Sequence, residues 1–369
     1  MEKLKLQIEL NNRPYSKDVI YAAVSLRGGY TTRNYLVDDS THFVANCAFY
    51  NILFNYYRMA NEAIGFHFDV QRAVSTISFC KKGAEFIPAL KCVLHTLFNH
   101  EYDSEQFEGA KQTTKDTFAL RYKDGAFRSK YKGYEFSDLN KRFTLKQLIY
   151  DIDNFTYEEF QKIAKTIIVP GNVCVYISGE TNVLDFSEIP LEDYEDQFSQ
   201  TVRIAGYGFD PYLRQDAHIT NKAREDHNLI IEAIEFLNDD CTNFTKMIIT
   251  ELLAEQVPAH EIDIWVDSLD ASIMFSSEQL RGYKAFLSID NEKTYDNVHR
   301  SLLTKYASLL ENSPEHFAIK AAHMMSVGVY IDQYLEFLDK CSYELFGELC
   351  VKADYKITEA QIVLRKESR

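Results

Sequence analysis

Residues 41–50 read Thr-His-Phe-Val-Ala-Asn-Cys-Ala-Phe-Tyr, and they open the segment around which the rest of the chain is organised. From this stretch onward, apolar and aromatic residues recur at steps of three and four, at Phe43, Cys47, Tyr50, Phe54 and Tyr57. This spacing places side chains on one face of a helix, and threonine is a preferred residue at a helix N-cap. We therefore predict a buried helix from Thr41 to about Asn61.

Strand patterns flank the predicted helix on both sides. Before it, apolar residues alternate with polar ones from Leu4 to Leu10, and an apolar run from Asp18 to Leu26 ends in a turn at Gly28-Gly29. After it come strand patterns at 66–71 and 73–80, helical patterns over 84–100, 104–123 and 136–167, and a closing strand at 172–178. This order predicts an α+β unit in which helices pack on a mainly antiparallel sheet.

The second half of the chain repeats the order of the first. Thr242-Asn243-Phe244 and the apolar stripe after it correspond to Thr41-His42-Phe43, 201 residues earlier. Two strand patterns follow this second helix, at about 266–275 and 281–289. Residues 180–200 are rich in acidic residues and contain neither Lys nor Arg, which is typical of a solvated linker. We predict two tandem homologous domains, residues 1–179 and 201–369, joined by this acidic linker at 180–200.

The composition narrows the class of protein. Apolar residues make up 46% of the chain and charged residues 26%, which is typical of a globular protein. The net charge of −15 disfavours nucleic acid as a partner, because that role needs a basic face. No apolar run is long enough for a membrane span, and the alternating start of the chain differs from a signal peptide. We therefore expect a cytoplasmic protein that binds neither nucleic acid nor membrane.

The order of these parts, and the histidine that opens the helix, resemble the pitrilysin/insulinase family of zinc peptidases, the inverzincins. Members of that family carry H-x-x-E-H on this helix; the two His bind zinc, and the Glu is the general base acting on the metal-bound water. The corresponding residues here are His42-Phe43-Val44-Ala45-Asn46. His42 matches the first ligand, Ala45 stands at the position of the base, and Asn46 stands at the position of the second His.

The family's third zinc ligand is a Glu on a later helix, where two Glu lie seven residues apart. Aligned to segment 107–118, those positions are Ala110 and Thr117, and neither carries a carboxylate. A catalytic zinc normally takes three protein ligands and a water. The family also has an Arg and a Tyr that hold substrate in the second domain, and the matching segment from Gln256 to Met274 contains neither residue type. The resemblance therefore predicts no catalytic residue, no bound metal and no cofactor in this chain.

In two-chain members of the family, an active subunit pairs with a similar inactive subunit that helps bind the peptide. This chain resembles the inactive subunit of small bacterial pairs, such as those in subtilosin-like bacteriocin or pyrroloquinoline quinone maturation. The resemblance implies a non-catalytic subunit of a heterodimeric zinc metallopeptidase. Zinc is then expected in the homologous active partner, and the substrate is expected to be a peptide, such as a ribosomally made bacteriocin precursor.

The peptide is expected to bind as an added strand, through backbone hydrogen bonds that need no metal. The candidate residues are Phe66, His67, Phe68 and Asp69, although such a pattern more often belongs to an ordinary sheet strand. Two other functions stay open: a structural or peptide-binding protein of peptidase descent without a proteolytic partner, and an enzyme that uses an unrecognised site. A partner that lacks H-x-x-E-H would favour the first, and metal in the purified chain would favour the second.

Overall fold

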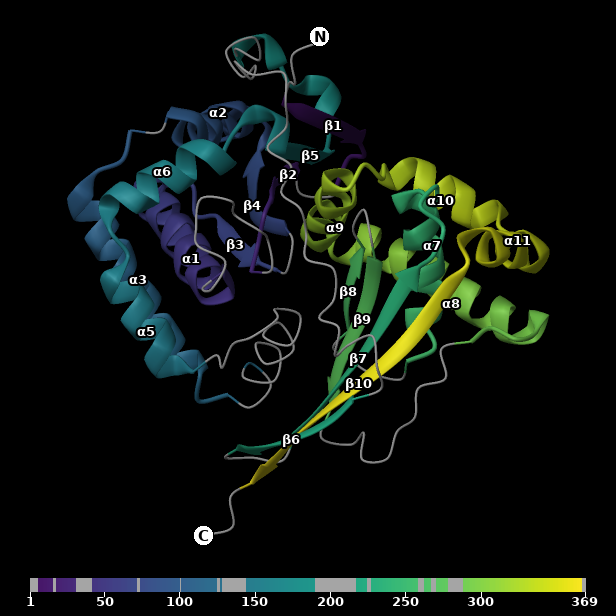
Figure 1. The fold of residues 1–369 in the computed structure, drawn as a ribbon. Helices are drawn as coiled ribbons and strands as arrows, with labels where there is room; N and C mark the ends of the chain where they lie inside the picture. Colours follow the sequence, from purple (N-terminus) through teal and green to yellow (C-terminus); the bar gives the residue numbers. More distant parts are fainter. Residues whose placement is uncertain are drawn as a thin grey trace. The chain divides into compact units, whose positions relative to one another are not determined.

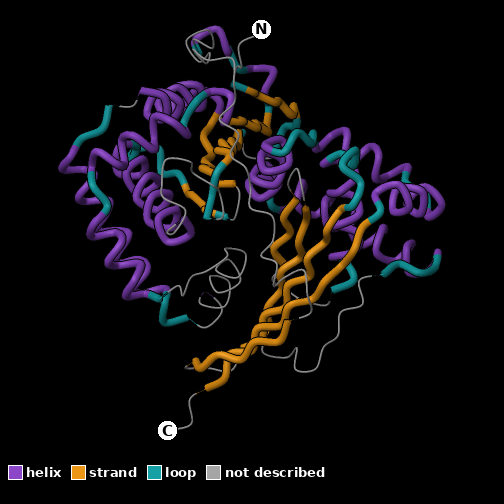
Figure 2. The backbone as a smooth tube through the Cα atoms, in the orientation of Figure 1, coloured by secondary structure: helices purple, strands orange, loops and turns teal. Residues whose placement is uncertain are grey.

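The computed structural model describes residues 6–15, 18–30, 42–71, 74–99, 101–124, 127, 144–189, 217–223, 227–257, 262–266, 270–277 and 288–366. These residues form two compact units, each with its own five-stranded sheet (Figures 1 and 2). Unit 1 takes the described residues up to Phe118, those from 144 to 189, and those from Leu309 to Ser326. Unit 2 takes the remaining described residues, most of which lie between 217 and 308 and between 327 and 366.

The sheet of unit 1 has the strand order β1-β5-β2-β4-β3. Its strands are β1 (Gln7–Asn12), β2 (Val19–Arg27), β3 (His67–Val70), β4 (Val74–Lys82) and β5 (Val173–Gly179). β1 and β5 run parallel, and every other neighbouring pair is antiparallel, so that Ala23 of β2 lies opposite both Ser78 and Tyr176. Within the described residues β3 is therefore an edge strand, paired with β4 on one side.

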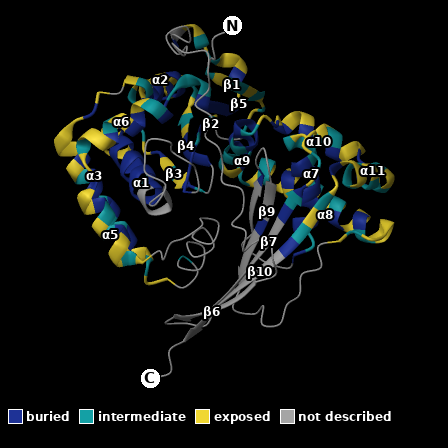
Figure 3. Ribbon diagram, viewed as in Figure 1, coloured by how far each residue is buried: buried dark blue, intermediate teal, exposed yellow. Residues whose placement is uncertain are grey.

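One face of this sheet is apolar and forms the core of unit 1. Val24, Ile77 and Val175 lie side by side on it, and all three are buried. The helices of the first half are α1 (His42–Ala60), α2 (Gly83–Asn99), α3 (Ser104–Arg121), α5 (Leu145–Asn154) and α6 (Tyr157–Ile167). α1 and α2 pack on the strands, while α5 and α6 pack on α1. Figure 3 accordingly shows α1 largely buried, whereas α3 and α5 carry many exposed residues.

The opposite face of the same sheet carries small and polar side chains, at Ser25, Thr76, Ser78, Cys174 and Ser178. It is covered by α9 (Pro314–Ser326), a helix from the second half of the chain that packs on β2, β4 and β5. Ser78 Oγ donates a hydrogen bond to Glu315 Oε1 over 2.9 Å, and Thr76 Oγ1 is hydrogen-bonded to His323 Nε2. Unit 1 is thus built from both halves of the sequence.

The sheet of unit 2 repeats the topology, with the strand order β6-β10-β7-β9-β8 and one parallel pair, β6 and β10. Its strands are β6 (Ala217–Ala223), β7 (His227–Phe236), β8 (Ile262–Val266), β9 (Asp270–Ser277) and β10 (Tyr355–Lys366). Its helices are α7 (Asn243–Ala254), most of α8 (Glu292–Asn312), α10 (Ile331–Lys340) and α11 (Tyr343–Ala353). The prediction of a duplicated α+β fold is therefore confirmed.

A buried carboxylate joins the helices of unit 2. Tyr306 of α8 and Tyr334 of α10 each donate a hydrogen bond of 2.6 Å to Glu251 Oε2 on α7. Burial and the neighbouring carboxylate hold the pKa of both phenols well above its ordinary value, so both hydroxyls remain donors.

One sequence prediction needs correction at its boundaries. In the second half, β8 and β9 form an antiparallel hairpin, in which Val266 lies opposite Ala271. The single strand expected over about 266–275 therefore spans the point where the chain reverses between β8 and β9. The alternation that forms β8 starts earlier, at Ile262, and most of 281–289 lies outside the described residues. In the part of the predicted linker that the structure describes, residues 180–189, the Asn182 N–H donates to Asn12 Oδ1 over 3.3 Å. Residues 190–200 lie outside the described residues.

No helix within the described ranges combines the length and the apolar character that a membrane crossing needs.

Candidate functional site

The first turn of α1 is where the sequence predicts the altered zinc motif. His42 begins the helix, and Ala45 lies within the same first turns, although the side chains of 42–45 lie outside the described residues, as does the predicted N-cap Thr41. From Asn46 to Tyr57 every residue of α1 except Asn51 is buried, and the last three residues of the helix are exposed. The turn before the helix packs closely on it: a Cβ at Gly28, where φ is +150°, would lie 2.1 Å from Tyr50 Oη. Only glycine fits there.

Asn46 uses its side chain as a structural link. It is 3% exposed, and its Nδ2 donates a hydrogen bond of 3.2 Å to the carbonyl oxygen of Tyr30, at the end of that turn. The Tyr30 N–H donates to the carbonyl of Gln71, directly after β3, and its hydroxyl accepts from Asn51 Nδ2 over 3.0 Å. The Asn46 amide therefore links α1 to the turn, and the Tyr30 N–H links the turn to the residue directly after β3. Sequence reasoning missed the role of Tyr30, which only the tertiary structure reveals.

The contacts between α1 and α3 show where the predicted third-ligand positions, Ala110 and Thr117, lie along α1. Asn55 Nδ2, in the C-terminal third of α1, donates to Thr114 Oγ1 in the middle of α3 over 2.9 Å. Further along α1, the methyl group of Met59 packs on Gly109, where an added Cβ would lie 2.9 Å from it. Residue numbers rise along α1 as they fall along α3, so the two helices run antiparallel.

This register separates Ala110 from Asn46. Asn55 lies about 13 Å from Asn46 along the axis of α1, at the usual rise of 1.5 Å per residue. Ala110, which is fully buried, lies on the far side of Thr114 from Asn46, so the structure does not bring those two residues together. Thr117 is half-buried and lies about one helical turn closer to Asn46 than Thr114 does. Along the helix axis it is still about 9 Å from Asn46.

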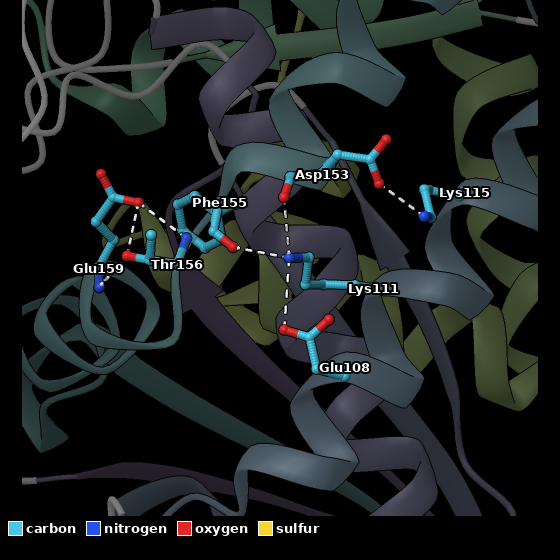
Figure 4. A network of polar contacts seen from close by, with 7 residues as sticks. All are labelled: Glu108, Lys111, Lys115, Asp153, Phe155, Thr156 and Glu159. Carbon is cyan, nitrogen blue, oxygen red and sulfur yellow. Dashed lines mark hydrogen bonds and ion pairs between the residues drawn. The ribbon is translucent and has the colours of Figure 1, made fainter.

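A buried lysine fixes the position of α3 (Figure 4). Lys111 is 8% exposed, and its Nζ donates to the carbonyl oxygens of Asp153 (3.2 Å) and Phe155 (3.1 Å), where α5 ends. α6 starts directly afterwards with a capping box, in which Thr156 and Glu159 satisfy each other's backbone N–H groups. The ammonium group thus satisfies helix-terminal carbonyls, as a cation at a C-terminus does.

The predicted peptide-binding residues lie on and beside the edge strand β3. His67 and Asp69 are exposed, Phe68 is half-buried, and Phe66 is buried just before the strand. Phe68 stacks on Phe54 of α1 at a centroid distance of 5.5 Å, and the Arg58 guanidinium carbon lies 5.6 Å from its ring centre. The part played by Arg58 was not predictable, because a sequence pattern does not show which strand faces a helix residue.

Next to this edge, β4 carries the exposed thiol of Cys80. Burial, together with the neighbouring Glu315, raises the pKa of the exposed Cys80 thiol on β4, so this cysteine is not an activated nucleophile. The Asn46 amide and the position of Ala110 do not fit the ligand set of a catalytic zinc. Among the residues that the structure describes, no three His, Cys, Asp or Glu side chains come close enough to hold a metal ion.

Comparison with known proteins gives matches in structure. No protein-family model matches this chain, and no curated protein matches it. A protein described as an M16-like peptidase from Alicyclobacillus acidocaldarius has a TM-score of 0.65 at 12% identity, over 99% of this chain and 98% of its own. A chain of complex III2 from Candida albicans has a TM-score of 0.65 at 12% identity, over 97% and 95%. An inactive domain of peptidase M16 from Pseudomonas fluorescens has a TM-score of 0.56 at 10% identity, over 98% and 95%.

These likenesses show the fold. Nearly the whole chain has the duplicated α+β architecture of M16-like peptidases, which is the fold that the resemblance to zinc peptidases predicted. The same architecture occurs in a protein described as an M16-like peptidase, in a chain of complex III2 and in a domain described as inactive. The fold by itself does not choose among these functions.

Proposed function

We propose that this chain is the non-catalytic subunit of a heterodimeric zinc metallopeptidase and that it binds a peptide as an added strand at β3. One observation carries the proposal: the buried Asn46 amide, at the family's second ligand position, is bonded to Tyr30, and Tyr30 is bonded to Gln71, the residue directly after β3. The polar group at this position therefore belongs to a chain of hydrogen bonds that runs from α1 through Tyr30 to the residue after β3. An extended peptide at such an edge gains backbone hydrogen bonds without a metal.

The other parts of the proposal come from the sequence resemblance. The partner is a homologous active subunit that carries H-x-x-E-H and zinc, and the substrate is a ribosomally made peptide such as a bacteriocin precursor. Both act in the cytoplasm. The likeness in fold to an inactive M16 domain supports a non-catalytic role of this kind.

A second function is favoured by one comparison. A chain of complex III2 has the same fold at a TM-score of 0.65, and it is a component of a larger assembly. The alternative is therefore a structural or peptide-binding protein without a proteolytic partner.

Co-purification with the product of the neighbouring gene separates the two functions. Each chain and the mixture are assayed for zinc and for cleavage of a peptide library. We expect zinc in the partner, and faster cleavage when this chain is added. A partner without H-x-x-E-H, or a cleavage rate that this chain leaves unchanged, would support the structural alternative. Stoichiometric zinc and cleavage by this chain by itself would overturn both.

A further inference from the structure

We infer that β3 selects an amphipathic extended peptide, with basic side chains on the face of Asp69 and apolar side chains on the face of Phe68. This inference rests on the proposed function, because it takes the peptide to bind at β3. It adds the chemical class of the peptide, which the resemblance to peptidases leaves open.

The hairpin between β3 and β4 determines which backbone groups face outward. The Gln71 N–H donates to the Val74 carbonyl over 2.9 Å, which makes these two residues a hydrogen-bonded pair. Bonded and non-bonded pairs alternate along an antiparallel ladder. Asp69 and His67 therefore bond toward β4, and the N–H and C=O groups of Phe68 point away from the sheet. The N–H and C=O groups of Val70 point the same way. The outward backbone groups of Phe68 and Val70, which are two residues apart, can therefore pair with an incoming strand.

One face of this edge is acidic and polar. Asp69 is exposed, and its Oδ2 accepts a hydrogen bond of 2.9 Å from Gln71 Nε2, which holds the carboxylate at the surface. Beyond it on the same face, Ser78 lies opposite His67 and donates to Glu315. Side chains directly opposite each other on neighbouring strands interact, and opposite charges there are favourable. A Lys or Arg of the peptide opposite Asp69 is therefore stabilised.

The other face of the edge favours apolar residues and disfavours basic ones. Phe68 is half-buried and lies on Phe54, so its accessible edge offers an apolar contact to a side chain opposite it. Arg58 is exposed beside the same ring, and its Nη2 donates to Asn55 Oδ1 over 2.8 Å, which holds the guanidinium there. A basic peptide residue on this face would meet a like charge. The two faces thus impose one orientation on an amphipathic strand.

The test uses the full chain and fluorescein-labelled nonapeptides, with affinity measured by fluorescence anisotropy at physiological salt. One peptide alternates Val and Lys, a second alternates Val and Glu, and a third has the composition of the first with the lysines placed in adjacent pairs. We expect the alternating Val/Lys peptide to bind at least about five-fold more tightly than the other two. Equal binding of the alternating and the paired lysine peptides would overturn the inference.

A matched pair of variants separates Asp69 from general attraction to a chain of net charge −15. Asp69→Asn removes the carboxylate at the edge. Asp116→Asn is the control, because Asp116 is also exposed and also accepts a 2.9 Å hydrogen bond from a glutamine, on α3. We expect Asp69→Asn to weaken Val/Lys binding about two- to five-fold and Asp116→Asn to leave it unchanged. Equal effects of the two variants would overturn the inference.

Backbone methylation tests the strand pairing itself. Val/Lys peptides are prepared with N-methyl groups on the valines only or on the lysines only, so that each loses the donors along one of its two edges. Because Phe68 and Val70 present the outward groups, antiparallel addition needs the valine N–H groups, and parallel addition needs those of the lysines. Loss of binding by one of these peptides and not the other supports strand addition. Equal behaviour of the two peptides would overturn it.

The outcomes also separate this inference from the proposed function. If this chain accelerates cleavage by a zinc-bearing partner, and Asp69→Asn leaves the preference of the pair for basic peptides unchanged, the inference fails and the function stands. If the Val/Lys peptide binds with the expected dependence on Asp69, and no proteolytic partner is found, the inference stands and the subunit role fails.

Discussion

Asn46 stands where the family that this chain resembles has a zinc-binding histidine, and its side chain makes a structural hydrogen bond. A histidine ligand presents a ring nitrogen to the metal, whereas the Asn46 amide donates to the Tyr30 carbonyl inside the protein. The identity of the residue is visible in the sequence, but its partner is not, because Tyr30 lies 16 residues earlier and meets Asn46 only across the turn between β2 and α1. The absence of catalysis at this position stays a prediction.

Asn46→Ala should destabilise the protein. The substitution removes a buried hydrogen bond between a helix and a turn, which contributes about 1–2 kcal/mol. Urea unfolding at neutral pH measures the loss of free energy. Asn99→Ala serves as the control, because Asn99 is an exposed residue bonded to an exposed Glu101 and should change the free energy of unfolding by less than about 0.5 kcal/mol. Unchanged stability of Asn46→Ala would contradict the structural role of the amide.

The buried thiol of Cys174 on β5 should make stability fall at alkaline pH. Burial raises the pKa of this thiol from 9.0 to about 11, and the nearby Arg27 offsets only part of the rise. Since the folded pKa exceeds the unfolded one, the contribution of the thiol is fully present below pH 9 and is lost as the pH rises toward 11. The free energy of unfolding should therefore fall more steeply over this range in the wild type than in Cys174→Ala. Equal slopes would count against a buried, protonated thiol.

At the scale of elements, Lys111 holds α3 against the junction between α5 and α6. Lys111→Met keeps most of the side-chain volume and removes the charge that satisfies two helix-terminal carbonyls, so it should cost about 1.5–3 kcal/mol. Lys115→Met, one turn further along α3, removes only a partly exposed ion pair with Asp153 and should cost about 0–1 kcal/mol. Thermal and urea unfolding compare the two variants. Equal costs would mean that Lys111 contributes only as a surface charge.

Several elements could be placed from the sequence, and the reasons are local. α1 has a long apolar stripe, and α6 has a capping box formed by Thr156 and Glu159, so both follow from residues that lie near each other in the sequence. β8 and β9 were misplaced because strands of similar alternation follow one another, and which residues reverse the chain depends on the partner strand. Pairing of α9 with the first sheet was not predictable, since its contacts join residues more than 230 positions apart.

The hydrogen bond between Thr76 and His323 should couple β4 to α9. A double-mutant cycle with Thr76→Val and His323→Leu should give a coupling energy of about 0.5–1.5 kcal/mol, because the side chains share one partly buried hydrogen bond. The control cycle pairs Thr76→Val with His316→Leu, since His316 lies on the same helix and is exposed. That cycle should give a coupling energy near zero. Additive effects of Thr76→Val and His323→Leu would show that the bond contributes nothing to the docking of α9.

At the scale of the whole molecule, the compact units do not coincide with the two halves of the sequence. The predicted boundaries, 1–179 and 201–369, assign α9 to the second domain, whereas its residues belong to unit 1. The reason is physical: the face of the first sheet that carries Ser25 and Thr76 is covered by α9, whose Ala318 and Ala322 are fully buried. The repeated order of strand and helix patterns reveals that the topology is duplicated. It does not show against which of the two sheets a helix such as α9 packs.

This composition of unit 1 predicts how fragments behave. A fragment of residues 1–205 lacks α9 and leaves the face of β2, β4 and β5 uncovered, so it should unfold at lower urea concentration and bind a hydrophobic dye more strongly than the full chain. A fusion that appends residues 309–326 through a flexible linker should recover most of the lost stability, because it restores the buried alanines and the bonds to Thr76 and Ser78. The control fusion carries Ala318→Asp and Ala322→Asp, which place charges against the sheet and should abolish the recovery. If the fragment 1–205 is as stable as the fusion, the first half of the sequence is an autonomous domain, and α9 contributes nothing to the stability of unit 1.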